Sequence, residues 1–237
     1  MYLRASLQRV ETASGEKCWE MSSEKYVRAS VINVEERLSK SECRLPIKCD
    51  TPMVTTYNPD EDVSKEFNAD GLQAYQEMIG ILRWAVEIGR INILLELSLL
   101  SSHLVFPRVG HLQAVYRLFG YLKQVPKRRL FFDPQKSLIS EDRFRKFDWD
   151  DFYSDAQEKI PLDMPRPRGK LVSTYCFVDA SHAGDRVTRR SMTRILIFVD
   201  RASLIWHSKR QNCVETSTFG SEFTAMKNAV ELIAALR

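Results

Sequence analysis

The spacing of apolar residues predicts a helical stretch in the first half of the chain. Between residues 24 and 124, apolar side chains recur every three or four positions, as they do on one face of an amphipathic helix. The pattern predicts four helices, over about 24–39, 72–89, 92–104 and 110–124. The third is apolar on nearly every side, so we expect it to be buried, and Pro107 is expected to end it.

Short β-rich runs lie on both sides of these helices. Residues 1–21 alternate weakly around a turn at Ser14–Glu16, which predicts a hairpin, and Leu130–Phe132 predicts a short strand. The C-terminal part predicts three strands and a helix, over 170–179, 192–199, 204–207 and 221–237. Such a helix normally crosses over to a parallel strand, which the sequence does not contain, so we expect half of an α/β layer.

Two stretches interrupt the periodic pattern. Residues 41–70 contain three prolines and an acidic run and are expected to form an irregular loop. Residues 133–170 contain most of the remaining prolines together with Trp149, Phe152 and Tyr153, and these aromatics indicate that the linker packs on something. The best boundary is 161–169. It divides the chain into residues 1–132, a linker over 133–169, and a C-terminal unit over 170–237.

Charge and cysteine content narrow the class of protein. The chain has 237 residues and a formal charge of +4, with basic clusters at 127–129, 143–146, 166–170 and 186–190. These clusters permit nucleic-acid binding but do not require it, so the helices fit a simple bundle or a nucleic-acid clamp. The five cysteines are scattered without metal-ligand spacing, which favours reduced thiols and predicts no zinc site. With no signal peptide and no membrane span, we expect a cytoplasmic or nuclear protein.

Two carboxylates are candidates for chemistry. Asp179 follows the apolar run at 175–178, which predicts a buried strand, and Glu222 lies near the start of the last helix. An acid on a strand facing an acid on a helix is a common way to build an open metal site. Two divalent ions about 3.5–4 Å apart would promote phosphodiester hydrolysis, but they need at least one more acid. Asp185 and Asp200 are the nearest candidates, and both are expected to point to solvent from strand ends.

Three motifs near these acids occur in an order known from one family. VDASHAGD at 178–185, followed by the Arg189-Arg190-Ser191 run, is similar to the pattern Y-S-D-A-D-W-A-G-D-x-x-x-R-R-S. WHSKRQ at 206–211 is similar to W-x-S-K-[KR]-Q, and STFGSEF at 217–223 is similar, more loosely, to S-S-T-E-A-E-Y. On these residues the chain resembles the ribonuclease H domain of copia-type LTR retrotransposon polyproteins.

The resemblance continues upstream. YQEMIGILRWAVEIGR at 75–90, HLQAVYRLFGYLK at 111–123 and CDTPM at 49–53 are each similar to a segment of the same polyproteins, in the same order. This implies the end of a reverse transcriptase region and its helical connection over 1–132, and a truncated ribonuclease H domain over 170–237. The expected fold is therefore α+β, with an N-terminal β-hairpin and a helical connection region before an incomplete three-layer α/β domain.

The resemblance also implies roles for individual residues. Asp179 and Glu222 correspond to catalytic, metal-binding carboxylates, which hold two Mg²⁺ ions in intact members of the family. Ala180, Ser217 and Ser221 are expected along an RNA–DNA hybrid, where 2′-hydroxyls identify the RNA strand. The expected phosphate contacts are Arg189, Arg190, Lys209 and Arg210.

Several positions depart from the family pattern. Ser181 stands in place of a second aspartate, His182 in place of tryptophan, Arg194 in place of glycine, and Asn92 in place of an expected aspartate. We expect His182 to fill the tryptophan's position rather than to bind a metal. The Y-x-D-D polymerase motif and the third catalytic aspartate do not occur in the sequence.

These departures shape the functional expectation. We expect a piece of a reverse transcriptase and ribonuclease H polyprotein whose ancestral activity was Mg²⁺-dependent cleavage of RNA in RNA–DNA hybrids, and which is inactive as this chain. The first alternative is a non-catalytic protein that binds nucleic acid or docks on the rest of the polyprotein. The second is a genomic remnant that is not expressed.

Overall fold

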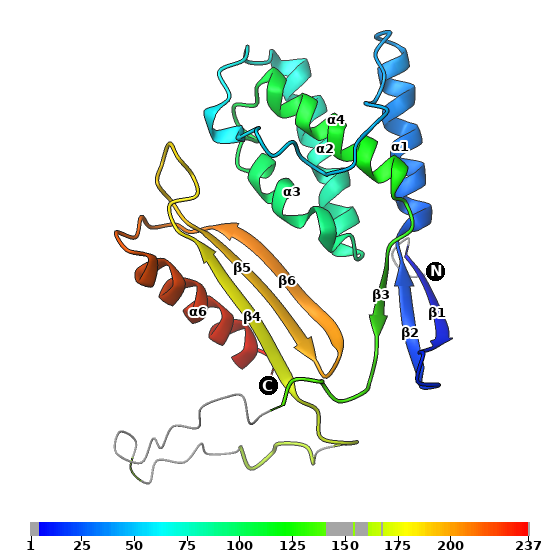
Figure 1. The fold of residues 1–237 in the computed structure, drawn as a ribbon, viewed down its shortest axis with the longest axis vertical. Coiled ribbons are helices and arrows are strands. Elements are labelled where there is room, and N and C mark those ends of the chain that lie inside the picture. Colours follow the sequence, from blue (N-terminus) through cyan, green and yellow to red (C-terminus); the bar gives the residue numbers. More distant parts are fainter. Residues whose placement is uncertain (1–4, 141–153, 155–160, 167, 237) are drawn as a thin grey trace.

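The computed structural model describes residues 5–140, 154, 161–166 and 168–236, and it has a mixed α+β architecture (Figure 1). Its two antiparallel sheets have the strand orders β1-β2-β3 and β4-β5-β6. The strands are β1 (Ser6–Glu11), β2 (Lys17–Ser22), β3 (Arg129–Phe132), β4 (Thr174–Ser181), β5 (Met192–Val199) and β6 (Ala202–Arg210). The helices include α1 (Glu24–Ser39), α2 (Ala69–Glu87), α3 (Leu94–Ser101), α4 (Val109–Gln124) and α6 (Thr218–Ala234), with short 3-10 turns at Pro59–Glu61 and Ile91–Ile93.

The largest core lies among α1, α2, α3 and α4. The apolar faces that the periodicity predicts for α1, α2 and α4 are confirmed, because nearly all of their predicted side chains are buried. The buried side chains include Val27, Val31, Val34 and Leu38 of α1, Tyr75, Ile79, Leu82 and Val86 of α2, and Val115, Leu118, Phe119 and Leu122 of α4. We call residues 5–132 the N-terminal region. No helix among the described residues has the length and hydropathy needed to cross a bilayer.

The hairpin and the short strand form one sheet. The predicted hairpin is confirmed as β1 and β2, and Gly15 takes a positive φ of 80° in the turn between them. Strand β3 returns from the end of α4 and pairs antiparallel with β2, with Trp19 opposite Phe132. The sequence predicted the strand at 130–132 but not its partner, because the two strands lie more than 100 residues apart.

Helix α3 is shorter and less buried than the sequence predicts. The predicted helix over 92–104 is divided into a 3-10 turn and an α-helix that ends at Ser101. Leu97 and Leu100 are buried, but Leu94 and Leu95 line a cavity beside the second sheet. The expectation of full burial was wrong, since one side of α3 faces this cavity rather than the core of the N-terminal region.

The second sheet lies between α6 and the N-terminal region, and we call residues 173–236 the C-terminal region (Figure 1). Successive strand residues point to opposite faces. On one face Cys176, Val178, Ile195, Ile197 and Ile205 pack with Ala229, Leu232 and Ile233 of α6. On the other face Trp206 packs against the core of the N-terminal region. Predicted strand bounds were approximate: β4 begins at Thr174, and β6 runs from Ala202 to Arg210.

The start of α6 is fixed by a side-chain cap. The Ser217 hydroxyl accepts a hydrogen bond from the backbone N–H of Gly220 at 3.0 Å, and α6 begins at Thr218. The sequence placed this start at about Ser221. The earlier start places Glu222 in the second turn of the helix, where its side chain reaches β4.

Arg90 is a cation buried in the N-terminal region. It is fully buried, and burial lowers the pKa of its guanidinium to about 10. It donates hydrogen bonds to the side chain of Asn92 (3.1 Å) and to the carbonyl of Pro126 (3.1 Å). Its Nη2 atom has no partner among the described residues. Both groups that it contacts are neutral, so the buried charge lacks a matching anion.

Replacement of Asn92 by aspartate should therefore stabilise the fold. The Asn92→Asp carboxylate would give Arg90 a charge-assisted hydrogen bond, and we expect the free energy of unfolding to rise by about 1 kcal/mol. Urea unfolding monitored by circular dichroism at pH 7 measures this change. The control is Asn92→Ala, which removes the acceptor and should lower stability. A loss of stability in Asn92→Asp would show that Arg90 is already adequately compensated.

Candidate functional site

Asp179 lies on an edge strand and is exposed. Strand β4 has only β5 as a neighbour, so its other edge carries no further strand in the described part of the chain. The Asp179 side chain is 60% exposed and accepts a hydrogen bond from Arg194 Nη1 at 3.1 Å. We expected a buried strand here. The expectation of burial was wrong because β4 lies at the margin of the sheet and Asp179 points away from α6.

Glu222 reaches the same edge from α6. Its Oε2 atom accepts a hydrogen bond from the backbone N–H of Ala180 at 3.1 Å. This N–H points outward from the sheet, so the carboxylate satisfies a donor that a neighbouring strand would otherwise pair. The bond brings together two motifs whose residues are 42 positions apart. Glu222 is therefore attached to the backbone of the residue next to Asp179.

The two acids nevertheless approach β4 from opposite faces. Asp179 is on the face that lines the cavity beside α3, whereas Glu222 belongs to the helix on the other face. Arg194, which is paired in register with Asp179, supplies a positive charge to the Asp179 carboxylate. A pair of carboxylates rarely holds two ions, and the described residues contain no cluster of three or more potential metal ligands. These residues do not fit a two-ion Mg²⁺ centre.

Neither candidate for a third acid points to solvent. Asp185 and Asp200 are both buried, so the expectation that both are exposed was wrong. Asp200 lies in the turn between β5 and β6 and accepts a hydrogen bond from the backbone N–H of Ser173. Burial alone would raise the pKa of Asp185, but hydrogen bonds from Thr188 and the nearby Arg210 guanidinium lower it below the ordinary value. Asp185 thus stabilises its own loop, whereas Asp200 ties the β5–β6 turn to the segment before β4.

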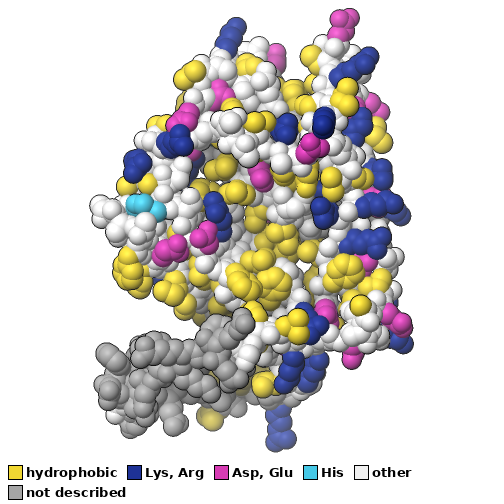
Figure 2. Space-filling view, in the orientation of Figure 1, with side chains coloured by type: hydrophobic (Ala, Val, Ile, Leu, Met, Phe, Trp, Pro, Cys, Tyr) yellow, Lys and Arg dark blue, Asp and Glu magenta, His cyan; other side chains and the backbone are white. Residues whose placement is uncertain are grey.

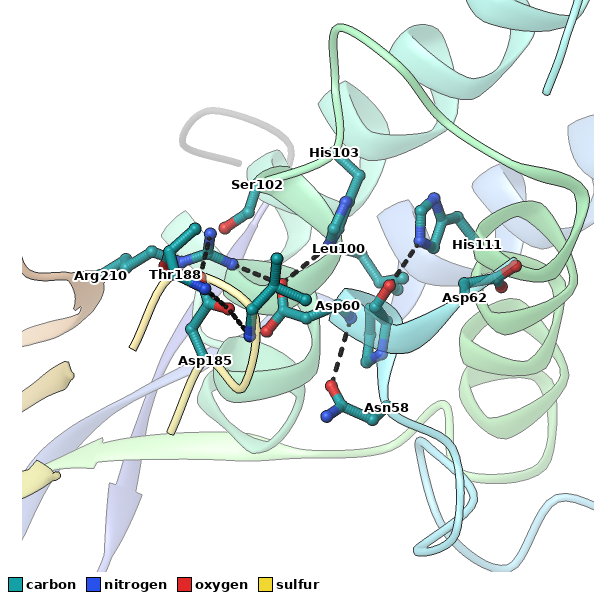
Figure 3. Close-up of polar contacts among 12 residues, drawn as sticks. Asn58, Asp60, Asp62, Leu100, Ser102, His103, His111, Asp185, Thr188 and Arg210 are labelled. Carbon is teal, nitrogen blue, oxygen red and sulfur yellow. Dashed lines mark hydrogen bonds and ion pairs between the residues drawn. The ribbon is translucent and has the colours of Figure 1, made fainter. Parts of the chain in front are cut away.

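Arg210 joins the two regions of the protein (Figure 3). Its guanidinium lies 2.8 Å from Oδ1 of Asp60 in the N-terminal region and 2.7 Å from Oδ2 of Asp185 in the C-terminal region. The Asp60 and Asp185 side chains are 5% and 2% exposed, so both charges depend on this cation for compensation. His103 Nε2 lies 3.2 Å from the same oxygen of Asp60. In this structure the Arg210 guanidinium pairs with these two carboxylates and is therefore not available to bind a phosphate.

His111 contacts both His103 and the turn that carries Asp60, and so supports the junction (Figure 3). Its Nδ1 accepts a hydrogen bond from the backbone N–H of Arg108 at 3.0 Å, so the proton of the neutral ring is on Nε2, which donates to the carbonyl of Pro59 at 2.8 Å. The ring stacks on His103 with a centroid distance of 4.1 Å. Burial lowers the pKa of His111. The neutral histidine therefore holds the turn that carries Asp60.

The other residues expected at a nucleic acid fall into two groups. Arg189 and Arg190 are exposed in the loop between β4 and β5, and Lys209 is exposed on β6. Ser217 caps α6, and Ala180 is buried. Ser221 is fully buried, donates to the carbonyl of Thr218 and accepts from Gln211 through its own carbonyl. The three basic side chains are exposed and can meet a phosphate, whereas the hydroxyl of the exposed Ser217 is used in the helix cap.

His182 makes no hydrogen bond or ion pair with either acid in the described part of the chain. It is half-buried, and its Nδ1 has no hydrogen-bond partner among the described residues. The junction residues Asp60 and His103 were missed by the sequence analysis. Asp60 lies in an irregular loop, and His103 lies just after a helix. Only the ion pair of Asp60 with the distant Arg210, and the contact of His103 with Asp60, identify them.

An apolar cavity of about 450 Å³ separates α3 from the face of the sheet that carries Asp179. Figure 2 shows hydrophobic side chains in the hollow between the two regions. The cavity is lined mainly by apolar groups, which include Ile91, Leu94, Leu95, Phe177, Leu196 and Trp206. The Asp179–Arg194 pair belongs to the same lining. The pair therefore has apolar side chains on its cavity side, while Asp179 and Arg194 remain 60% and 41% exposed.

Loss of Arg210 should destabilise the whole protein. Arg210→Ala would leave the carboxylates of Asp60 and Asp185 buried without a cation, and we expect the free energy of unfolding to fall by about 3–5 kcal/mol. Urea unfolding at pH 7 provides the measurement. Lys209→Ala is the matched control, since its exposed side chain should contribute less than about 0.5 kcal/mol. Equal losses in the two variants would contradict a central role for the junction.

His111 should make stability depend on pH. Because the pKa of His111 is lowered by burial, the unfolded chain takes up a proton at this residue at a higher pH than the folded protein does. The free energy of unfolding should therefore be highest above pH about 6.5 and should decline as the pH falls below it.

Comparison of unfolding at pH 5 and pH 7.5 measures this effect. His111→Asn removes the titration and keeps an acceptor for the N–H of Arg108, so its pH dependence should be shallower than that of the wild type. His207, whose pKa is lowered by burial and by Lys209, remains in both proteins and cancels in the comparison. Identical slopes would mean that His111 titrates normally.

Comparisons with known proteins add no relative. The chain matches no protein-family model, no curated protein and no solved structure. The chemistry of the β4 edge is therefore inferred from the contacts of its own residues.

Proposed function

We propose that the chain is a segment of a copia-type retrotransposon polyprotein whose C-terminal region is a ribonuclease H-like module that binds RNA–DNA hybrids without cleaving them. The observation that carries the proposal is the hydrogen bond between Glu222 and the N–H of Ala180. It places the acid of the third motif at the same strand edge as Asp179, the acid of the first motif. The three antiparallel strands followed by a helix support the same interpretation.

The contacts of Asp179 support loss of cleavage. In intact members of the family, carboxylates hold Mg²⁺ ions that stabilise the attacking and leaving oxygens. Here Arg194 occupies the position of a glycine and its guanidinium pairs with Asp179. Asp185 is held by backbone N–H groups of its own loop, and Asp200 by the backbone N–H of Ser173. A cation beside Asp179 opposes the binding of a second cation there.

Binding to a hybrid is supported by the exposed basic loop between β4 and β5. Arg186, Arg189 and Arg190 are all exposed, and Arg186 makes one ion pair with Glu61 across the junction. Arginines on a loop provide sequence-independent phosphate contacts, whose strength falls with added salt. The proposed function is thus retention of the nucleic-acid surface after loss of the metal centre.

Docking on another part of the polyprotein is the second candidate function. It is favoured by the apolar cavity between α3 and the second sheet, which has hydrophobic side chains at its surface (Figure 2). An apolar surface of this kind suits a protein partner better than a polyanion. Hybrid binding remains the preferred function because the basic loop lies next to the motif acids.

Binding and cleavage can be measured on one hybrid. We expect fluorescence anisotropy with a labelled RNA–DNA duplex to show salt-dependent binding, weakened several-fold when Arg189 and Arg190 are both changed to alanine. The slope of log K against log salt should fall by about two. The matched control changes Lys40 and Lys48 to alanine, which removes the same charge from a distant exposed surface. Equal weakening in both pairs would reduce the interaction to net charge.

Cleavage is tested on the same duplex with Mg²⁺. We expect no cleavage of the RNA strand by the wild type and unchanged binding by Asp179→Asn. Robust cleavage that Asp179→Asn abolishes would overturn the proposal and establish an active nuclease.

A further inference from the structure

The loop between β4 and β5 is closed by its own acid. Asp185 Oδ1 accepts hydrogen bonds from the backbone N–H groups of Val187 (3.0 Å) and Thr188 (2.9 Å), and Oδ2 accepts one from the Thr188 hydroxyl. The main chain of Asp185 adds two bonds, because its carbonyl accepts from the N–H of Arg189 (2.8 Å) and its N–H donates to the carbonyl of Arg190 (3.1 Å). Asp185 is thus bonded to each of these four residues.

Two residues of the loop have a backbone conformation that side chains other than glycine rarely adopt. Ala183 and Arg189 have positive φ angles of 48° and 59°. The backbone N–H of Ala183 donates to the Ser191 hydroxyl (3.0 Å), and the N–H of Arg189 is bonded to Asp185. Residues in this conformation persist where the surrounding contacts fix them, so the loop has one defined shape.

Asp185 is an acid in a basic loop, but its charge is buried and paired. Its side chain is 2% exposed and lies 2.7 Å from Nη1 of Arg210, which also pairs with Asp60 of the N-terminal region (Figure 3). At the distance of a phosphate on the loop surface, the fields of two such paired charges largely cancel. The carboxylate can therefore organise the loop without repelling a polyanion strongly.

Three arginines project from this closed loop. Arg186, Arg189 and Arg190 are all exposed. Arg186 Nη1 lies 3.2 Å and 3.4 Å from the two carboxylate oxygens of Glu61, and both side chains of this ion pair are exposed. Exposed ion pairs are weak, so a phosphate can replace Glu61. A loop of one shape thus presents three guanidinium groups together.

We propose that Asp185 is a positioning residue for nucleic-acid binding, because it fixes the loop so that Arg186, Arg189 and Arg190 are placed for phosphates before a hybrid binds. A flexible loop would lose conformational freedom on binding, and this cost lowers the affinity. In a loop that is already closed, the backbone part of the cost is incurred on folding instead. The inference rests on the proposed hybrid binding, and it assigns the residue that organises the binding loop.

Charge and positioning predict opposite results when Asp185 is changed to alanine. Removal of an acid near a phosphate site should strengthen the binding of a polyanion on electrostatic grounds. Loss of the acceptor for Val187 and Thr188 should instead loosen the loop and weaken binding. We expect the dissociation constant of a labelled RNA–DNA duplex, measured by fluorescence anisotropy, to rise about 10-fold in Asp185→Ala. The slope of log K against log salt should become shallower, because fewer phosphates are contacted at once.

Asp60→Ala is the matched control. Asp60 is the other buried carboxylate on Arg210, so this variant removes the same charge and the same kind of ion pair but no hydrogen bond of the loop. We expect its affinity and salt slope to equal or exceed those of the wild type, at a temperature where circular dichroism shows both variants to be folded. Equal losses in the two variants, or tighter binding by Asp185→Ala, would overturn the inference and leave hybrid binding in place. A wild type that does not bind the duplex would overturn the proposed function and this inference with it.

Hydrogen exchange measured by NMR tests the closed loop in the wild-type protein, without any variant. Val187 and Thr188 are exposed, yet their amide protons are bonded to Asp185. We expect these two protons to exchange at least about 100-fold more slowly than in an unstructured peptide, in the absence of nucleic acid. Exchange at the rate of an unstructured peptide would show that the loop is open before binding and would overturn the inference.

Discussion

The compensation of two buried carboxylates by Arg210 is the constraint on which the arrangement of the two regions depends. Asp60 and Asp185 lie far apart in the sequence, and both lose nearly all contact with water. Buried charges are tolerated only when they are paired, so the position of the Arg210 guanidinium fixes both loops at once. The stacked histidines behind Asp60 hold its turn in place. The β4–β6 sheet therefore meets α3 in one defined position.

This position changes the chemistry that the motif residues can perform. The family resemblance predicts that Arg210 contacts a nucleic-acid phosphate. In this structure it instead holds two regions of the protein together. Asp185 belongs to the motif that carries Asp179, yet hydrogen bonds from Thr188 and Val187 keep it in its loop. Asp179 is left with an exposed ion pair to Arg194. We therefore propose that a site built this way supports binding better than metal-dependent cleavage.

The margin of the sheet is the second determinant of function. Because β4 is an edge strand in the described part of the chain, its one acid, Asp179, is exposed, and Glu222 of α6 bonds to one outward backbone donor, the N–H of Ala180. The same edge is the place where the two acid motifs meet. The nucleic-acid binding that we propose would use the exposed arginines of the loop that follows β4.

The sequence by itself determined the local structure: the apolar faces of α1, α2 and α4, the first hairpin, and the order of three strands and a helix at the C-terminal end. Hydrophobic periodicity and turn residues encode each of these elements within a short stretch of sequence. Only the tertiary structure decided the end of α3, the burial of Asp185 and Asp200, the pairing of β3 with β2 and the role of Arg210. Each of these depends on contacts between distant residues, because burial and charge compensation are properties of the folded surface rather than of any sequence window.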